Sequence, residues 1–302
     1  MIERYTHNKI TWIDVIGPTN EEIHELIEEC GIPREFADDL TTMTPKSEVF
    51  THKGFLKITL DFPIVKRTDI NHPHEVKFLV TKSHFITIRF EDIEAIHRFG
   101  KEYEVLCMLN GKEKQTPLTL FIILLARFYE AMYVKLDYLE SKLKDIEEEI
   151  FKEHEEAMVY ELSSVSRRLI AFKQTIDAHN EALEKLAPSI SLAFSKKQDV
   201  AIEGIIHQYK VVKRRLRALT STFNDLRQTN DSLLETKQNS IMKVLTIISF
   251  ITFPLMLFSS MFGMNTENTP IIGNPIDFWI IVMVMIAVST VLLIYFKYKR
   301  WL

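Results

Sequence analysis

The sequence has little of what enzymes, metal clusters and disulfide-rich proteins need. Its two cysteines, Cys30 and Cys107, form no CxxC pair. A metal cluster or a disulfide framework is therefore not expected, and we predict that both are buried, reduced thiols. No GxSxG, P-loop, HExxH or GxGxxG motif stands in a context that would suit catalysis. We predict that the protein is not an enzyme.

An excess of positive charge is missing as well. The formal net charge is −4 at pH 7, which argues against nucleic acid as the main partner. The opening sequence MIERYTHNKITW has no apolar core of the kind found in signal peptides. We therefore expect the soluble part of the chain to stay in the cytoplasm.

Charged residues are absent from two stretches near the C-terminus. No Asp, Glu, Lys or Arg occurs within 244–262 or within 278–296. Each stretch is roughly 19 residues long, close to the ~20 that a helix needs to cross a hydrocarbon core of ~30 Å. We predict two membrane-spanning helices, 244–265 and 278–296, joined by an external loop, 266–277.

The charges that flank these stretches predict their orientation. Basic residues precede the first and follow the second, in a tail at 297–302: Lys237, Lys243, Lys297, Lys299 and Arg300. The connecting loop has no basic residue and carries Glu267 and Asp277. By the positive-inside rule, both termini are cytoplasmic and the loop is external. We predict a multi-pass protein of the cell membrane.

The residues before 244 predict a large soluble part. Residues 1–115 favour a mixed α/β domain, because β-rich runs alternate with turn signals and helical patterns. The expected strands are 10–16, 48–52, 55–62, 76–81 and 84–89. The expected helices run from Thr19 or Asn20 to Gly31, then over 33–40 and 91–103.

Long helical patterns begin at residue 116. Thr116 and Pro117 suit a helix start, and the apolar segment 118–126 is too short to span a membrane, so it is expected in the protein core. A second helix, 160–186, is expected to stop at Pro188. Residues 116–198 thus form a helical region that contains an acidic helix pair.

A third helix is expected to begin near Asp199 and to continue into the first span. Its soluble part, 199–243, would be a stalk, and the whole helix has roughly 60 residues or about 90 Å. A single helix of that length needs packing partners. An apolar seam offers them a surface: Ile202, Ile205, Ile206, Tyr209, Val212, Leu216, Leu219, Phe223 and Leu226.

An acidic run lies in the helical region, and two interpretations of it remain open. Its members are Asp145, Glu147, Glu148, Glu149, Glu153, Glu155 and Glu156. The run is typical of a solvated helix face. It also suits a surface that concentrates divalent cations near a pore mouth.

A stripe of residues follows one side of the first predicted span at three- and four-residue steps. Its members are Asn239, Met242, Thr246, Ser249, Phe253, Met256, Ser260 and Gly263. In one interpretation the hydroxyls bond to their own helix and the stripe packs against the second span. In the other, the stripe faces copies of itself around a central pore, because polar groups at membrane depth prefer protein or water to lipid.

Several of these residues carry a resemblance to a known family. The pattern Asn239, Met242-Lys243, Leu245-Thr246, Pro254 and Gly263-Met264-Asn265, with two terminal spans and the closing KYKRWL, resembles the CorA family of magnesium channels of the GMN type. The resemblance implies a homopentamer with the first spans inside and the second outside. The implied fold is a cytosolic mixed α/β domain with a long stalk helix that continues into the first of two membrane helices.

The resemblance also implies a function and an outer filter. It implies a passive channel for Mg²⁺, with Co²⁺ or Ni²⁺ as further substrates. Gly263, Met264 and Asn265 would form the filter, where amide oxygens hold the hydrated ion through its water shell. Gly263 would let the backbone turn, Met264 would fix the loop, and Glu267 would raise the local cation concentration.

Further sites follow from the same resemblance. The stripe would line the pore, with Met242, Leu245 and Phe253 as apolar constrictions and Met256 where related sequences have a polar residue. Cytosolic Mg²⁺ would regulate the channel at acidic residues: Asp199 and Glu203, with Asp38, Asp39 or Asp61. The basic residues Lys297, Lys299 and Arg300 would ring the inner mouth or act as membrane anchors.

Two other functions remain open. A zinc transporter of the same fold is one of them, although Met264 at the centre of the GMN motif favours magnesium. A membrane-tethered scaffold or sensor without transport is the other. It predicts no metal flux and no effect of changes at Asn265.

Overall fold

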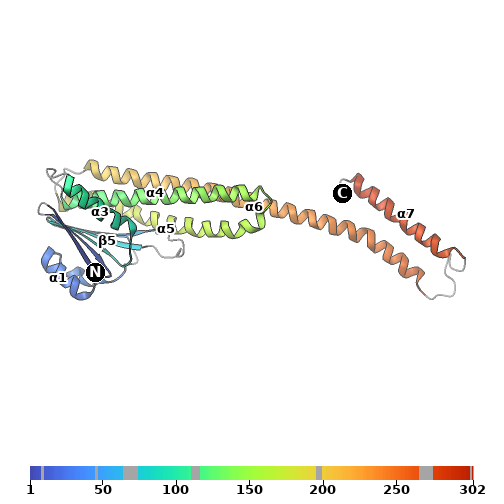
Figure 1. Ribbon diagram of the computed structural model, residues 1–302, viewed down its shortest axis with the longest axis horizontal. Helices are drawn as coiled ribbons and strands as arrows, with labels where there is room; N and C mark the ends of the chain where they lie inside the picture. The colour runs from blue at the N-terminus through green and yellow to red at the C-terminus, as the bar shows by residue number, and fades with distance from the viewer. Residues whose placement is uncertain are drawn as a thin grey trace. The chain divides into compact units, whose positions relative to one another are not determined.

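The computed structural model describes most of the chain: residues 1–7, 10–44, 47–63, 74–109, 116–194, 199–264, 275–299 and 301. These residues form two compact units, Met1–Arg227 and Gln228–Leu302. Figure 1 shows the elements of both units in chain order. Each unit is described by itself.

The first unit is built on a six-stranded sheet with strand order β1-β2-β6-β5-β4-β3. The strands are β1 (Ile2–His7), β2 (Ile10–Ile16), β3 (Glu48–His52), β4 (Phe55–Phe62), β5 (His74–Val80) and β6 (His84–Arg89). Neighbouring strands are antiparallel, except that β2 and β6 are parallel. Four predicted strands are confirmed with their bounds, and the strand predicted at 76–81 is β5. The edge strand β1 was not predicted.

Helix α1 (Asn20–Cys30) covers one face of this sheet. Its start is specified by a capping box, in which the Thr19 hydroxyl accepts from the Glu22 N–H and Glu22 accepts from the Thr19 N–H. Its end is specified by Gly31, which has a φ of 68°. The predicted helix at 33–40 is a short 3₁₀ turn, η1 (Arg34–Phe36), followed by α2 (Ala37–Thr41).

The other face is covered by α3 (Glu94–Leu109) and α4 (Pro117–Ile150), which follow the sheet in sequence. Aromatic rings join α4 to the strands: the centroids of Phe128 and Phe62 lie 4.0 Å apart, and those of Phe121 and Phe78 lie 5.6 Å apart. The segment 118–126 therefore belongs to the core, as predicted.

Helix α5 (Glu155–Ala193) corrects the sequence prediction at both ends. The predicted helix covers 160–186 and stops at Pro188, whereas α5 begins at Glu155 and continues through Pro188 to Ala193. A proline inside a helix costs about 3 kcal/mol, but the residues around it are held by tertiary contacts. Leu186 and Ile190 are buried, α5 packs on β3 and β4, and the Gly54 N–H bonds to the Ala193 carbonyl.

Helix α6 (Asp199–Phe262) is continuous over 64 residues, which confirms the predicted long helix. Its part within the first unit buries the predicted seam, with Ile206 less covered than the others. The Tyr209 ring lies 6.1 Å from that of Tyr129 on α4, and its hydroxyl donates to Asn180 on α5. Arg215 forms ion pairs with Asp137 and Glu140 on α4. The stalk segment is thus packed against two helices of its own chain.

The second unit contains the C-terminal part of α6 and helix α7 (Asp277–Tyr298). Phe250 of α6 and Phe296 of α7 have ring centroids 6.1 Å apart, so the two helices are in contact. Buried and half-buried apolar residues recur on one face of each helix: Ile247, Ile251, Pro254, Phe258 and Phe262 on α6, and Ile281, Met285, Val288, Leu292 and Phe296 on α7. Thr246, Ser249 and Leu255 of α6 are half-buried as well. Most other apolar side chains of this unit are exposed.

Among the described residues, three helices are long and apolar enough to cross a membrane: Pro117–Ile150, Ala201–Phe262 and Asp277–Tyr298. Length and composition alone give this result. The first differs from the other two because half of its apolar window is buried within the protein, against 6% and 0% for the others. Only the second and third helices present their apolar residues outward.

Candidate functional site

The polar stripe lies on the side of α6 that is turned away from α7. Ile247, which is only 5% exposed, marks the packed face. Met256 is about two and a half helical turns further along, on the opposite face, and it is 65% exposed. Ser249, Phe253 and Ser260 fall within about 60° of Met256. The stripe therefore does not form the contact with the second span.

Two hydroxyls of the stripe bond to their own helix. Thr246 donates to the Met242 carbonyl at 2.7 Å, and Ser249 donates to the Leu245 carbonyl at 2.9 Å. Each hydroxyl has one donor and two acceptor lone pairs. The donor is satisfied without any partner helix, and the lone pairs can still accept hydrogen bonds from water.

The apolar residues predicted as constrictions of the pore are uncovered in a single chain. Exposed fractions are 52% for Met242, 55% for Leu245 and 66% for Phe253. Asn239 and Ser260 are exposed too. A row of large apolar residues on an exposed helix face needs lipid or another protein surface to cover it.

The first span ends at Phe262 and is followed by a turn at Gly263. The Gly263 N–H bonds to the Ser259 carbonyl at 3.0 Å, and a Cβ added at Gly263 would lie 3.1 Å from that oxygen. A side chain at residue 263 would crowd the last turn of α6, which explains why glycine suits this position. Met264 is 58% exposed. Asn265 and Glu267 lie outside the described residues.

The basic residues after α7 are solvent-accessible. Lys297 and Lys299 are exposed at the C-terminal end of the helix, where cations interact favourably with the helix dipole. Arg300 lies outside the described residues.

The acidic residues predicted to hold regulatory Mg²⁺ are not gathered within one chain. Asp38 and Glu203 are exposed, and the side chain of Asp199 lies outside the described residues. In the part of the chain that the structure describes, no group of three or more His, Cys, Asp and Glu side chains is placed to hold a metal ion.

The Asp39 carboxylate already interacts with the ammonium groups of two lysines. Its carboxylate forms a hydrogen-bonded ion pair with Lys57 of β4 and lies 3.7 Å from the Lys77 ammonium of β5. Glu75 lies 3.2 Å from the same ammonium. Burial would raise the pKa of Asp39, but Lys57 and Lys77 lower it below its ordinary value. The two carboxylates and two ammoniums balance in charge, so this cluster has no excess negative charge to attract a cation.

Asp61 lies in a different setting, at the end of β4. Burial raises the pKa of its carboxyl. Its backbone carbonyl accepts a hydrogen bond of 2.6 Å from Nε2 of His179 on α5, and Nδ1 of that ring accepts from the buried Tyr129 hydroxyl at 3.0 Å. These bonds fix the neutral tautomer of His179, and burial lowers its pKa to about 4.

Comparison with known proteins decides the family. The family model for CorA-like Mg²⁺ transporter proteins matches residues 7–300. The chain belongs to this family. The family consists of transporters, so the prediction that this CorA-like protein is not an enzyme is confirmed.

The sequence similarity to known CorA proteins extends over nearly the whole chain. The cobalt/magnesium transport protein CorA of Thermotoga maritima is 23% identical over 297 residues, covering 97% of this chain and 83% of the relative. The cobalt/magnesium transport protein CorA of Methanocaldococcus jannaschii is 21% identical over 299 residues, covering 97% of this chain and 92% of the relative.

Solved structures resemble the fold. The complete CorA magnesium transporter from Methanocaldococcus jannaschii aligns with a TM-score of 0.81 at 20% identity, covering 97% of this chain and 92% of that one. The full-length CmaX protein aligns with a TM-score of 0.75 at 16% identity, covering 97% of this chain and 89% of the CmaX chain. The predicted fold class, a mixed α/β domain with a long helix that continues into the first of two C-terminal apolar helices, is confirmed.

Sequence analysis missed the buried charges of the soluble unit. Asp14 of β2 and Arg89 of β6 are 1% and 2% exposed, and their side chains meet at 2.8 Å. Lys57 and Lys77 are equally buried. The signal was present, because each of these residues interrupts an apolar strand. Each of these charges has a partner on another element that could not be read from the pattern, although Lys77 also contacts Glu75 on its own strand.

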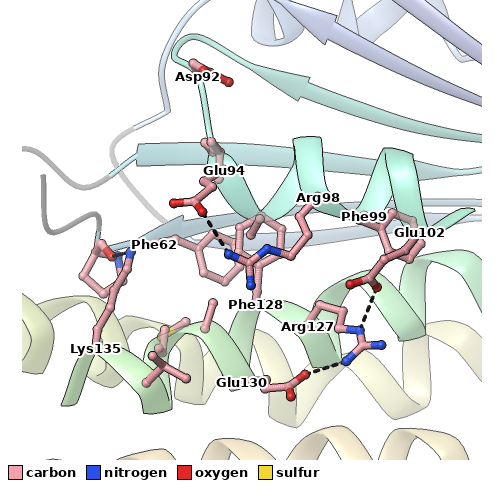
Figure 2. A pocket seen from close by; sticks show the side chains of 16 residues that line it. Phe62, Asp92, Glu94, Arg98, Phe99, Glu102, Arg127, Phe128, Glu130 and Lys135 are labelled. Carbon is pink, nitrogen blue, oxygen red and sulfur yellow. Dashed lines mark hydrogen bonds and ion pairs between the residues drawn. The ribbon is translucent and has the colours of Figure 1, made fainter. Parts of the chain in front are cut away.

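A cavity between α3 and α4 was also missed. It has a volume of about 570 Å³ and is lined by residues of both helices and by Phe62 and Pro63 at the end of β4 (Figure 2). It lies entirely within the first unit.

Proposed function

We propose that the chain forms a passive channel through which the membrane potential drives Mg²⁺ into the cell. The observation that carries the proposal is the position of the stripe, on the face of α6 opposite its contact with α7. Membership of the CorA-like Mg²⁺ transporter family supports it. Relatives that are cobalt/magnesium transport proteins support Co²⁺ as a further substrate, and Ni²⁺ is proposed by resemblance.

A pore requires several copies of this hairpin. Two helices in contact leave no lumen between them, and the apolar side chains of the second unit are exposed in one chain. We propose a homopentamer in which the first spans surround the lumen and the second spans face the lipid. In this arrangement the stripe of each copy is turned toward the pore axis. Both termini lie in the cytoplasm, as the positive-inside rule requires.

The stripe suits the passage of a hydrated ion. The Thr246 and Ser249 hydroxyls use their donors within the helix, so their oxygens accept hydrogen bonds from the ion's water shell. Mg²⁺ loses its waters reluctantly, and uncharged oxygens hold such an ion weakly enough for release. Met242, Leu245 and Phe253 would narrow the lumen and close it by dewetting.

The outer mouth would select the ion. Helix α6 ends at Phe262, and Gly263 and Met264 stand between its end and Asn265 in the sequence. A ring of Asn265 amides, one from each copy, would hold hydrated Mg²⁺, and Glu267 would attract cations to the mouth. A divalent ion that crosses ~100 mV gains about 4.6 kcal/mol. Residues 244–262 and 278–296 contain no ionisable Asp, Glu, Lys or Arg for a proton relay.

Regulation by cytosolic Mg²⁺ would use acids of more than one copy. Asp199 and Glu203 at the start of α6 are the proposed ligands on one side. Asp38 is a better partner than Asp39, because Asp38 is exposed whereas Asp39 is neutralised by two lysines. Asp61 is the weakest of the proposed ligands, because burial favours its protonated form.

The test is Mg²⁺ entry into proteoliposomes with an inside-negative potential. Wild-type protein should admit Mg²⁺ in proportion to the potential, and Asn265→Ala should abolish most of the flux. Thr290→Val is the matched control, because the Thr290 hydroxyl bonds to its own helix on α7, and it should leave the flux unchanged. Flux that is equal in Asn265→Ala and wild type contradicts the filter.

A second pair of variants tests the orientation of the stripe. Met256 on α6 and Val291 on α7 are each 65% exposed in one chain. If the stripe faces the lumen, Met256→Trp blocks Mg²⁺ entry and Val291→Trp, which faces lipid, does not. Equal flux in the two variants contradicts a pore-facing stripe. Zn²⁺ flux without Mg²⁺ flux would favour the zinc transporter, and no flux of either ion would favour a scaffold or sensor.

A further inference from the structure

The cavity between α3 and α4 has the size and lining of a small-molecule site. Its volume of about 570 Å³ lies within the range of ~300–1,000 Å³ that is usual for ligand pockets. Its floor is aromatic, with Phe62, Phe99 and Phe128 among the lining residues. Charged side chains surround this floor (Figure 2).

The charged side chains are not equally satisfied. Arg98 pairs with Glu94 at 2.9 Å. Arg127 pairs with Glu102 at 3.3 Å and with Glu130 at 2.8 Å. These groups stand at the rim, with exposed fractions of 38% or more. Water therefore screens them, and they need no ligand.

Lys135 differs from the two arginines. Its ammonium donates to the Pro63 carbonyl at 3.0 Å, and no described carboxylate lies within ion-pair distance of it. An ammonium has three donors, and the Lys135 side chain is half-buried in the cavity wall. Burial lowers the pKa of Lys135, and the nearby Glu94 carboxylate acts in the opposite direction. A cation in such a place is stabilised by an anion that brings its own hydrogen-bond acceptors.

The first turn of α3 adds positive potential to the same end of the cavity. The turn begins at Glu94, and residues 92–95 line the cavity. Figure 2 shows Glu94 and Lys135 at one end of the cavity, and Glu102 and Arg127 at the other. Free N–H groups at a helix start attract anions. The carboxylates at this end are paired with arginines, Glu94 with Arg98 and Asp92 with Arg89. The Lys135 ammonium and the helix start therefore favour an added negative charge there, and the aromatic rings favour an apolar body beside it.

We propose that this cavity binds a small aromatic carboxylate, with the carboxylate on Lys135 and the ring on the phenylalanine floor. The site lies wholly in the first unit, so it does not depend on the proposed channel. A ligand there would bridge α3 and α4, and α4 carries the acids that bind Arg215 of the long helix.

The test measures binding of 1-naphthoate to the full-length protein in detergent by equilibrium dialysis, with empty micelles subtracted. Lys135→Met removes the charge and keeps the length of the side chain. Lys144→Met is the matched control, because Lys144 is exposed on the same helix and does not line the cavity. The neutral 1-naphthalenemethanol serves as a comparison probe.

We expect saturable binding of 1-naphthoate to wild type and to Lys144→Met, and at least tenfold weaker binding to Lys135→Met. The neutral alcohol should bind both lysine variants alike. Ala131→Phe, which places a ring in the cavity one turn before Lys135, should abolish binding of both probes while circular dichroism stays native. No saturable binding to folded wild type, equal naphthoate affinity in Lys135→Met, or binding that survives Ala131→Phe would overturn the proposal.

Discussion

The two compact units use polar side chains in opposite ways. In the first unit, buried polar groups connect distant parts of the chain. The Thr87 hydroxyl on β6 donates to Asp14 on β2, and Trp12 donates to that same hydroxyl. In the second unit, the Thr246 and Ser249 hydroxyls bond to carbonyls four residues earlier in the same helix. Removing a polar group should therefore matter much more in the first unit than in the second.

The units also differ in where their apolar surface goes. The first unit encloses its apolar residues between the sheet and the helices, so Phe78, Phe121 and Leu136 are fully buried. In the second unit Phe253 and Met283 are 66% and 67% exposed in a single chain. The first unit is completed by its own packing. The second needs lipid or further copies to cover it, which is what a membrane-embedded assembly provides.

The largest expected effect is the loss of a buried charge in the first unit. Lys77→Met should lower the free energy of unfolding by about 3–5 kcal/mol, because it leaves Glu75 and Asp39 with less compensation in the interior. Urea unfolding of the full chain in detergent can follow Trp12, which is 1% exposed. A background with Trp279→Phe and Trp301→Phe leaves Trp12 as the one tryptophan of the chain.

The control for this experiment is Lys144→Met at an exposed position, where a change within about 0.5 kcal/mol is expected. A loss of less than 1 kcal/mol in Lys77→Met would mean that the buried cluster does not support the fold. The contrast between the two units would then be unfounded.

A smaller effect should come from pH, through His179. Its pKa is about 4 in the folded protein, against 6.5 for an ordinary histidine. Because the folded state binds this proton less readily, its contribution is complete above pH 6.5 and is lost as pH falls toward 4. Unfolding free energy should fall by about 2 kcal/mol between pH 7 and pH 5, at ~1.4 kcal/mol for each unit below 6.5.

His179→Gln provides the comparison, since glutamine does not titrate. The difference in stability between wild type and this variant should change with pH in that window, and the same Trp12 signal can measure it. Asp61 and Glu75, whose pKa values burial raises, contribute in the opposite direction, and they are present in both proteins. A pH-independent difference would show that His179 remains charged or exposed when folded.

The smallest effect is expected in the second unit. Ser249→Ala removes a hydroxyl that bonds within its own helix, so the stability of the helix in detergent should change by less than about 0.5 kcal/mol. Thermal melting followed by circular dichroism can measure it. A loss above 1 kcal/mol would mean that Ser249 bonds to another helix, and the comparison between the units would have to be revised.

Local rules predicted many elements of the first unit. The Thr19 side chain marks the start of α1, and the left-handed backbone of Gly31 marks its end. The strand-like runs 55–62 and 84–89 predicted β4 and β6. The failures share one cause. Pro188 remains inside α5 because packing on β3 and β4 outweighs a local penalty, and β1 is a half-exposed edge strand whose order depends on pairing with β2.

The candidate pore could be predicted in part. Helical periodicity placed Ser249, Phe253 and Met256 on one line, but periodicity does not say what a line faces. Contact between α6 and α7 decided that the line lies opposite the packed face. The prediction for Asp39 met a similar limit, because nothing near it in sequence indicates Lys57 and Lys77 as its partners.

The sequence by itself determined the two apolar helices, the length of α6 and the family pattern around Gly263. These properties depend on residues that are neighbours in the chain or recur along one helix. Only the tertiary structure decided which charges are neutralised, which face of α6 is covered by α7, and that α3 and α4 enclose a cavity beside Lys135. Those properties depend on contacts between residues far apart in sequence, where burial sets the strength of each interaction.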